Sequence, residues 1–329
     1  MIRKYSYQCR DYSILTPIFK KYLVEPLIVL IPISIPANIV TIVSNLFVYL
    51  SVTLAFIYGN DARWNFILIP ISLTVYIIGD HLDGLQAKRT GTSSALGEFC
   101  DHFLDTFNTG LILLIMFQLF NVQYEYLMIY LMTTSYLAHA SIFYHQFKTG
   151  WLVFEKFGSL EAMVLTIILL FLSFLPGVYD LLTTAVWKFT IIEYLLMLSS
   201  VGALATFTKT LVDTKTLSTC WLWFCLLFIV LALFLAATDP GNYLYSVLIL
   251  YPSLYIGGLM HGHLIDGREL FPDILSVLML GAVFFINQAV SLHSYLLYYL
   301  VLRVCFLTFT TFYALRSHWV WVNPKTAIK

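Results

Sequence analysis

Long apolar stretches alternate with short polar turns over most of this chain. Ten stretches are about 20 residues long or close to it, which is the length that an α-helix needs to cross the hydrocarbon core of a bilayer. We therefore predict an all-α fold, a polytopic helical membrane protein with about ten transmembrane helices. The predicted spans cover residues 38–58, 64–80, 94–119, 122–144, 158–176, 189–211, 219–238, 241–262, 270–289 and 291–315.

Residues 12–35 depart from this pattern. Lys20 and Lys21 stand beside bulky apolar side chains, and Pro26 and Pro32 interrupt the apolar run that follows. An unbroken span of about 20 residues does not fit into such a segment. We expect an N-terminal interfacial amphipathic helix here, followed by a turn.

The composition supports the membrane assignment. Of the 329 residues, 60% are hydrophobic and 11% are charged, whereas the apolar share of a soluble domain is nearer half. The formal net charge is zero, so nothing favours nucleic acid as a partner. We find no internal repeat and no linker, and we interpret residues 1–329 as a single membrane domain.

The basic residues indicate how the spans are oriented, because Lys and Arg concentrate on the cytoplasmic side of a membrane. With the spans above, fifteen of the 18 Lys and Arg residues fall on one side. Only Arg63 and Lys188 fall on the other, and Arg303 lies within the last span. We therefore expect both termini to be cytoplasmic, together with the polar stretch of residues 80–105.

That polar stretch places four aspartates in a sequence that is otherwise apolar. Asp80 and Asp83 are three residues apart, and Asp101 and Asp105 are four apart, so on helices each pair projects from one face. Carboxylates grouped at a membrane edge are costly unless cations neutralise them, and hard divalent cations prefer oxygen ligands. Two such pairs that meet across two helices would form a divalent-metal site.

The same stretch resembles the signature of the CDP-alcohol phosphatidyltransferases. The runs Asp83–Gly91 and Ser93–Glu98, followed by Asp101-His102, are most similar to the choline and ethanolamine phosphotransferases of that superfamily. Lys88 stands where the family usually has arginine, and Phe103 replaces a glycine. The signature residues, in chain order, are Asp80, Asp83, Gly84, Ala87, Lys88, Gly97, Asp101 and Asp105.

The resemblance implies a centre that binds two Mg²⁺ or Mn²⁺ ions. Such ions neutralise a diphosphate and orient the attacking and leaving oxygens. For the proton of the acceptor hydroxyl we favour His102 as the catalytic base, since its unperturbed pKa suits that work near neutrality. Many branches of the superfamily give this role to the last aspartate, so Asp105 is the alternative. The expected metal ligands are Asp80, Asp83, Asp101 and Asp105.

Other residues of the signature are implied to bind the substrate. The absence of a side chain at Gly84 and Gly97 would let the helices and the nucleotide approach closely. Either Lys88 or Arg89 would contact the diphosphate, and the sequence leaves that choice open. The full substrate-binding set is Asn38, Gly84, Ala87, Lys88, Arg89, Gly97 and Glu98.

The implied reaction transfers phosphocholine or phosphoethanolamine from CDP-choline or CDP-ethanolamine to diacylglycerol, with CMP released. About residues 36–211 would form a six-span catalytic core that the lipid enters from the bilayer, and residues 219–316 would add four spans.

One alternative is a CDP-diacylglycerol-dependent transferase acting on another alcohol such as inositol or glycerol phosphate, and a second is a cation transporter. The head group stays open, as do the membrane (bacterial inner membrane, or endoplasmic reticulum or Golgi) and the oligomeric state, a homodimer being one option.

Overall fold

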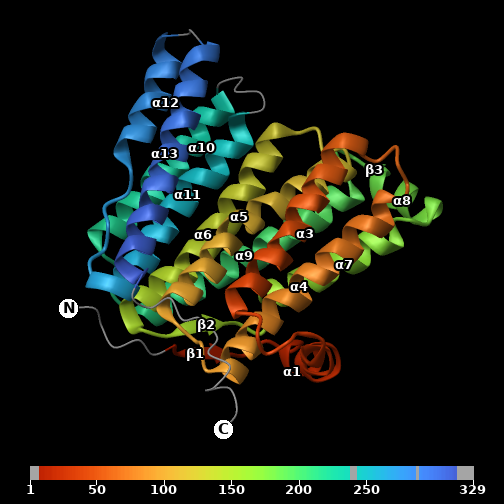
Figure 1. The fold of residues 1–329 in the computed structure, drawn as a ribbon. Helices are drawn as coiled ribbons and strands as arrows, with labels where there is room; N and C mark the ends of the chain where they lie inside the picture. The colour runs from red at the N-terminus through yellow and green to blue at the C-terminus, as the bar shows by residue number, and fades with distance from the viewer. Residues whose placement is uncertain (1–6, 238–242, 287–288, 317–329) are drawn as a thin grey trace.

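The computed structural model describes residues 7–237, 243–286 and 289–316, and these are mostly helical. The long helices run as a bundle, with short loops between them (Figure 1). Their bounds are α3 Ala37–Tyr58, α4 Asn65–Thr90, α5 Ala95–Leu119, α6 Glu125–Thr149, α7 Ser159–Leu172, α8 Pro176–Thr183, α9 Ile191–Thr214, α10 Thr219–Ala237, α11 Tyr243–His261, α12 Ile274–Ile286 and α13 Ala289–Leu315.

The prediction of an all-α polytopic membrane protein is confirmed, and every predicted span overlaps a helix. Within the described ranges, however, seven helices are long and apolar enough to cross a membrane, and the bent pair α7–α8 would make an eighth. The count of ten is therefore not confirmed. α12, at 13 residues, is only about 20 Å long. α6 is long enough, but polar residues such as His139, His145 and Gln146 lower its mean hydropathy.

One predicted span, residues 158–176, is divided in the structure. α7 ends at Leu172, and α8 starts at Pro176 with its axis turned by 117°. Proline is favoured in the first turn of a helix, where its missing N–H is not needed, so Pro176 starts a new helix instead of extending α7. A short hairpin of β3 (Ala185–Val186) and β4 (Phe189–Thr190) follows α8.

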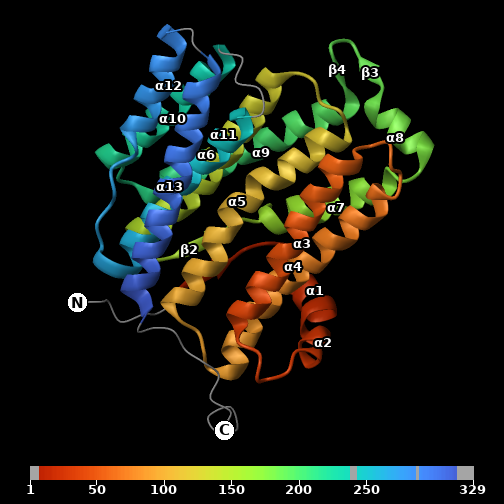
Figure 2. The same cartoon turned by 45° about the horizontal axis from the view of Figure 1, so that its top comes forward.

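The helices form two groups around a central pair. α3, α4 and α7 pack together on one side, α5 and α6 lie in the middle, and α10 to α13 gather on the other side against α5 and α6. Figures 1 and 2 both show α3 and α4, drawn in orange, apart from α12 and α13, drawn in blue. The division into a six-span core and four further spans stays a prediction.

The segment before α3 is helical but irregular. It consists of α1 (Thr16–Phe19), the π-helical turn η1 (Lys20–Val24), α2 (Glu25–Leu27) and the 3₁₀ turn η2 (Ile28–Leu30). Phe19 and Val24 face the protein, whereas Ile18, Tyr22 and Leu23 are exposed. Its location at the membrane interface stays a prediction.

Two short strands near this segment were not expected from the sequence. β1 (Cys9–Asp11) pairs in parallel with β2 (Leu152–Phe154), which lies between α6 and α7. β1, β2 and α1 lie at one end of the bundle, and α8 and β3 lie at the other (Figure 1). The strand pair thereby fixes residues 9–11 at the end of the bundle where α4 ends and α5 begins.

Local sequence explains how α4 and α5 are joined at that end. α4 ends at Thr90, and the next residue, Gly91, has a φ of 65° in the left-handed region that favours glycine. Ser94 then caps α5, because its Oγ accepts a 3.1 Å hydrogen bond from the backbone N–H of Gly97. This short connection turns the chain back on itself, so the acidic residues of α4 face those of α5.

Candidate functional site

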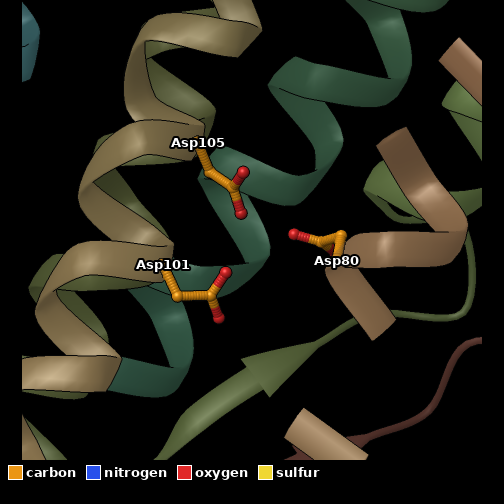
Figure 3. A group of neighbouring side chains, drawn as sticks. All are labelled: Asp80, Asp101 and Asp105. Atoms are coloured by element: carbon orange, nitrogen blue, oxygen red, sulfur yellow. The ribbon is translucent and has the colours of Figure 1, made fainter. Parts of the chain in front are cut away.

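Three of the four aspartates meet between α4 and α5. One carboxylate oxygen from each of Asp80, Asp101 and Asp105 lies within 4.8 Å of the other two. Figure 3 shows Asp101 and Asp105 one turn apart on one helix, with Asp80 pointing toward them from the facing helix. We call these three residues the aspartate trio.

The trio fits a divalent cation. Oδ1 of Asp101 is buried and has no hydrogen-bond partner within the described part of the chain. A buried carboxylate oxygen without a partner costs free energy, and a bound ion would remove that cost. The three donors are all carboxylate oxygens, the ligand type that Mg²⁺, Mn²⁺ and Ca²⁺ prefer.

Asp83 lies outside the trio. Its buried side chain accepts, at Oδ2, a 2.6 Å hydrogen bond from Oγ1 of Thr41 on α3. Thr41 follows Asn38 by three residues, so this bond holds the first turns of α3 against the acidic part of α4. The role of Asp83 as a metal ligand stays a prediction.

A polar network orients Asp105 from deeper in the bundle. Its Oδ1 accepts hydrogen bonds from the hydroxyl of Tyr76 at 2.7 Å and from Nδ2 of Asn108 at 3.3 Å. Nδ2 of Asn108 also donates to Oδ1 of Asn45 on α3, at 2.7 Å. The network joins α3, α4 and α5, and it restrains the Asp105 carboxylate next to the other two.

The two glycines of the signature have different surroundings. A Cβ atom at Gly97 would lie 3.1 Å from Oδ1 of Asn38 and 3.3 Å from Oγ of Ser94. At Gly84, which is exposed, a Cβ atom would meet nothing within 4 Å. Gly97 thus lets the start of α3 approach α5, as expected for a close helix contact, whereas Gly84 borders open space.

Lys88 and Arg89, the basic pair that follows Gly84, have different surroundings. The Arg89 guanidinium donates to the carbonyl oxygens of Ile28, at 2.9 Å, and of Ile31. Lys88 is exposed, and no ion pair or hydrogen bond of its side chain is found among the described residues. Arg89 therefore fastens the segment before α3 to the end of α4, while Lys88 is exposed.

Gln86 adds to the same attachment. Its Nε2 donates to the carbonyl oxygens of Pro32, at 3.0 Å, and of Ile35, at 2.7 Å, and the side chain is fully buried. These bonds fix the loop that leads into α3. They set the position of Asn38, which is half-buried at the start of that helix.

His102 lies beside the trio. Its Nδ1 is 3.8 Å from Oδ2 of Asp101, and its ring packs against those of Tyr7 and Phe143. One turn earlier on α5, Glu98 accepts a 2.7 Å hydrogen bond from Nε2 of Gln146 on α6. Both residues therefore lie where α5 contacts α6.

Sequence reasoning missed several residues that support the site. Asn108 follows Asp105 by three residues and Tyr76 precedes Asp80 by four, so helical periodicity could have placed both beside the aspartates. Tyr7 could not have been found in this way, because its contact with α5 depends on the pairing of β1 with β2.

Comparison with known proteins assigns the chain to a family. A model of the CDP-alcohol phosphatidyltransferase family matches residues 34–198, about half of the chain. This range contains the trio and every substrate-binding residue expected from the sequence.

Individual relatives support the same assignment. An uncharacterised CDP-alcohol phosphatidyltransferase class-I family protein of Schizosaccharomyces pombe is 31% identical over 191 residues, which cover 54% of this chain and 47% of that protein. Cholinephosphotransferase 1 of Saccharomyces cerevisiae is 27% identical over 190 residues, covering 54% of this chain and 46% of that protein. Choline/ethanolaminephosphotransferase 2 of Arabidopsis thaliana is 31% identical over 119 residues, covering 33% and 30%.

The chain spans about half the length, or less, of the curated relatives it matches. The segment that the family model matches, residues 34–198, carries the trio and its signature. The chain therefore belongs to the CDP-alcohol phosphatidyltransferase family.

Proposed function

We propose that this protein transfers phosphocholine or phosphoethanolamine from the CDP-alcohol to diacylglycerol within a membrane. The aspartate trio is the observation that carries the proposal, because it offers three carboxylate oxygens to a divalent cation inside the segment that defines the family. The names of the yeast and plant relatives support choline or ethanolamine as the head group.

The trio would bind Mg²⁺ or Mn²⁺, and Asp83 would complete the set of ligands for two ions. When bound, such ions neutralise the diphosphate and orient the attacking and leaving oxygens. The Thr41 and Tyr76 hydroxyls hold Asp83 and Asp105 in place through their hydrogen bonds of 2.6 Å and 2.7 Å. A carboxylate held in this way is oriented for its ligand before the ligand arrives.

In the proposed reaction, the diacylglycerol hydroxyl oxygen attacks the β-phosphorus of the CDP-alcohol. The bond between that phosphorus and the bridging oxygen breaks, and the oxygen leaves with CMP. His102 accepts the proton of the hydroxyl group, for which it is suited as an imidazole next to the Asp101 side chain. Asp105 is better used as a ligand, because Tyr76 and Asn108 already direct hydrogen bonds to one of its oxygens.

The nucleotide would lie over the open surface at Gly84, with Lys88 on the diphosphate. Lys88 is the better candidate of the basic pair, since Arg89 is engaged by two backbone carbonyls. Asn38, Ala87, Gly97 and Glu98 line the same end of the helices and complete the proposed binding site. This end would face the cytoplasm, and the diacylglycerol would reach it from the bilayer.

A donor panel tests the proposal. The full-length purified protein is reconstituted with Mg²⁺ and diacylglycerol, and CMP release and lipid product are measured with CDP-choline, CDP-ethanolamine and CDP-diacylglycerol plus inositol or glycerol phosphate. We expect product from one or both CDP-aminoalcohols. Asp101→Asn should abolish it, while Asp180→Asn, at an exposed aspartate far from the trio in sequence, should not. Product from CDP-diacylglycerol alone would overturn the proposal.

A further inference from the structure

We propose that Tyr7 is a positioning residue for His102, brought to the site by a strap that consists of residues 7–15. This inference rests on the proposed role of His102 as the base. Tyr7 precedes the matched family segment, which begins at residue 34, and neither the family signature nor the matched segment includes it.

The His102 imidazole contacts two aromatic rings. The Tyr7 ring is stacked with it, with the centroids 6.1 Å apart and the planes 25° apart. The ring of Phe143 on α6 lies at 5.8 Å with a tilt of 57°. Both separations are within the range in which aromatic rings attract each other.

Hydrogen bonding does little to orient this imidazole. Its nearest charged neighbour is Oδ2 of Asp101, 3.8 Å from Nδ1, which is beyond hydrogen-bond distance. No hydrogen bond of the His102 side chain is found among the described residues. The two rings therefore supply the lateral contacts that limit how the imidazole can turn.

The strap is firmly attached to the rest of the protein, which gives Tyr7 a defined place. The backbone N–H of Leu152 donates to the carbonyl of Gln8 at 2.9 Å, directly after Tyr7. β1 continues the pairing through Asp11, and the N–H of Tyr12 donates to the carbonyl of Phe154 at 2.9 Å.

Side chains secure the two ends of this pairing. The Arg10 guanidinium stacks on the Trp151 ring at 4.2 Å from its centroid. At the far end, Oε1 of Glu161 on α7 accepts hydrogen bonds from the Ser13 hydroxyl, at 2.6 Å, and from the Leu15 N–H, at 3.1 Å. The strap is thus attached to residues between α6 and α7 and to the first turn of α7, and these attachments hold Tyr7 next to α5.

A base must lie within hydrogen-bond reach of the proton that it accepts, and small errors in its placement lower the rate strongly. Without the Tyr7 ring, the imidazole can turn away from Phe143 into the vacated space. We expect Tyr7→Ala to lower kcat by about ten- to a hundredfold. KM for the CDP-alcohol should stay within about twofold, because no hydrogen bond or ring contact joins Tyr7 to Lys88 or Gly84 in the part of the chain that the structure describes.

The first experiment compares three substitutions at Tyr7 with a matched control in the strap. Tyr7→Phe keeps the ring and should retain normal kcat. Tyr7→Leu keeps an apolar side chain but no ring, so its kcat should be as low as that of Tyr7→Ala. The leucine variant also serves if Tyr7→Ala does not fold. Tyr12→Ala removes a ring of the same strap for which no contact with His102 is found among the described residues, and it should leave kcat unchanged. Normal kcat in Tyr7→Leu, or equal losses in Tyr7→Phe and Tyr7→Leu, would overturn the inference.

A second experiment separates this inference from the proposed function. CMP release from a radiolabelled donor is measured for His102→Ala with and without Tyr7→Ala. If Tyr7 acts through His102, the second substitution costs nothing further once the imidazole is gone. If His102→Ala alone has normal kcat, the proposed base is wrong and the role of Tyr7 fails with it. If His102→Ala is inactive while Tyr7→Leu has normal kcat, only the role of Tyr7 is wrong.

Discussion

The Thr41 hydroxyl donates a 2.6 Å hydrogen bond to Oδ2 of Asp83, so the first helix of the bundle holds a carboxylate of the second. Both side chains are buried. This bond crosses from α3 to α4 at the depth of the aspartate trio, and it links Asn38, three residues before Thr41, to the acidic stretch. It couples the stability of the helix pair to the geometry of the site.

Thr41→Val keeps the shape of the side chain but removes this donor. A buried acceptor that loses its partner costs about 1–3 kcal/mol, so we expect a lower unfolding temperature and reduced kcat. Thr53→Val is the matched control on α3, since among the described residues the Thr53 hydroxyl bonds only to the Tyr49 carbonyl, at 2.8 Å, and the pair is exposed. Thermal unfolding in detergent and CMP release measure both effects. Equal stability of the two variants would contradict the coupling.

Metal binding at the trio predicts a stabilisation that depends on the ion concentration. A ligand that binds only the folded protein adds about 2.7 kcal/mol at a hundred times its Kd. We expect Mg²⁺ or Mn²⁺ to raise the unfolding temperature of the wild-type protein, and not that of Asp101→Asn. Asp180→Asn should respond like the wild type. The same rise in Asp101→Asn would place the ion elsewhere.

The two signature glycines should respond differently to alanine. Alanine in a helix interior is favoured over glycine by about 0.5–1 kcal/mol, and at Gly84 nothing opposes it within 4 Å. Gly84→Ala should therefore unfold at the same or a higher temperature, and it should raise KM for the CDP-alcohol because its methyl group enters the proposed nucleotide space. Unchanged KM would remove Gly84 from the binding site.

Gly97→Ala should not gain the stability that alanine usually gives in a helix. Its Cβ would lie 3.1 Å from Asn38 and 3.3 Å from the Ser94 oxygen that caps α5, so both side chains must shift. We expect no gain in unfolding temperature and a higher KM for the nucleotide, through displacement of Asn38. Gly84→Ala, measured in the same assay, is the comparison. A gain in stability with normal KM would show that Asn38 moves without consequence.

Substitutions at Arg89 and Lys88 should have different effects, one on stability and the other on substrate binding. Arg89→Ala removes hydrogen bonds to the carbonyls of Ile28 and Ile31, each worth about 1 kcal/mol or more, and should lower the unfolding temperature. Lys88→Ala should leave that temperature unchanged and raise KM for the CDP-alcohol. Thermal unfolding and initial rates over a range of donor concentrations test both. The reverse pattern would assign the diphosphate to Arg89.

Much of the fold and part of the site could be predicted from the sequence. Apolar windows located every long helix, because burial in a bilayer leaves a continuous hydrophobic signal. Spacing in the acidic stretch anticipated that carboxylates of two helices meet, since helical periodicity puts Asp101 and Asp105 on one face. The sequence did not indicate that Asp83 lies outside the trio. That position depends on the hydrogen bond from Thr41, which orients the Asp83 side chain.

The break between α7 and α8 and the strap could not be predicted in this way. A window of average hydropathy passes over Pro176 without registering the change of direction. β1 is only three residues long, too short to display the alternation of a strand, and its partner lies far along the chain. Contacts of this kind depend on the assembled bundle rather than on local propensity.

The pairing of β1 with β2 also sets an order of events during synthesis. Cys9 pairs with Leu152, so β1 cannot pair with β2 until α3, α4, α5 and α6 have all been made. At translation rates of 5–20 residues per second this takes roughly 7–30 s. A nascent chain that ends after Asp105 and before Leu152 already contains all four aspartates, yet it lacks the strand that pairs with β1. The contact between Tyr7 and His102 therefore joins a residue made before these helices to a residue of α5, and the strand pair that supports it forms only after β2 has been made.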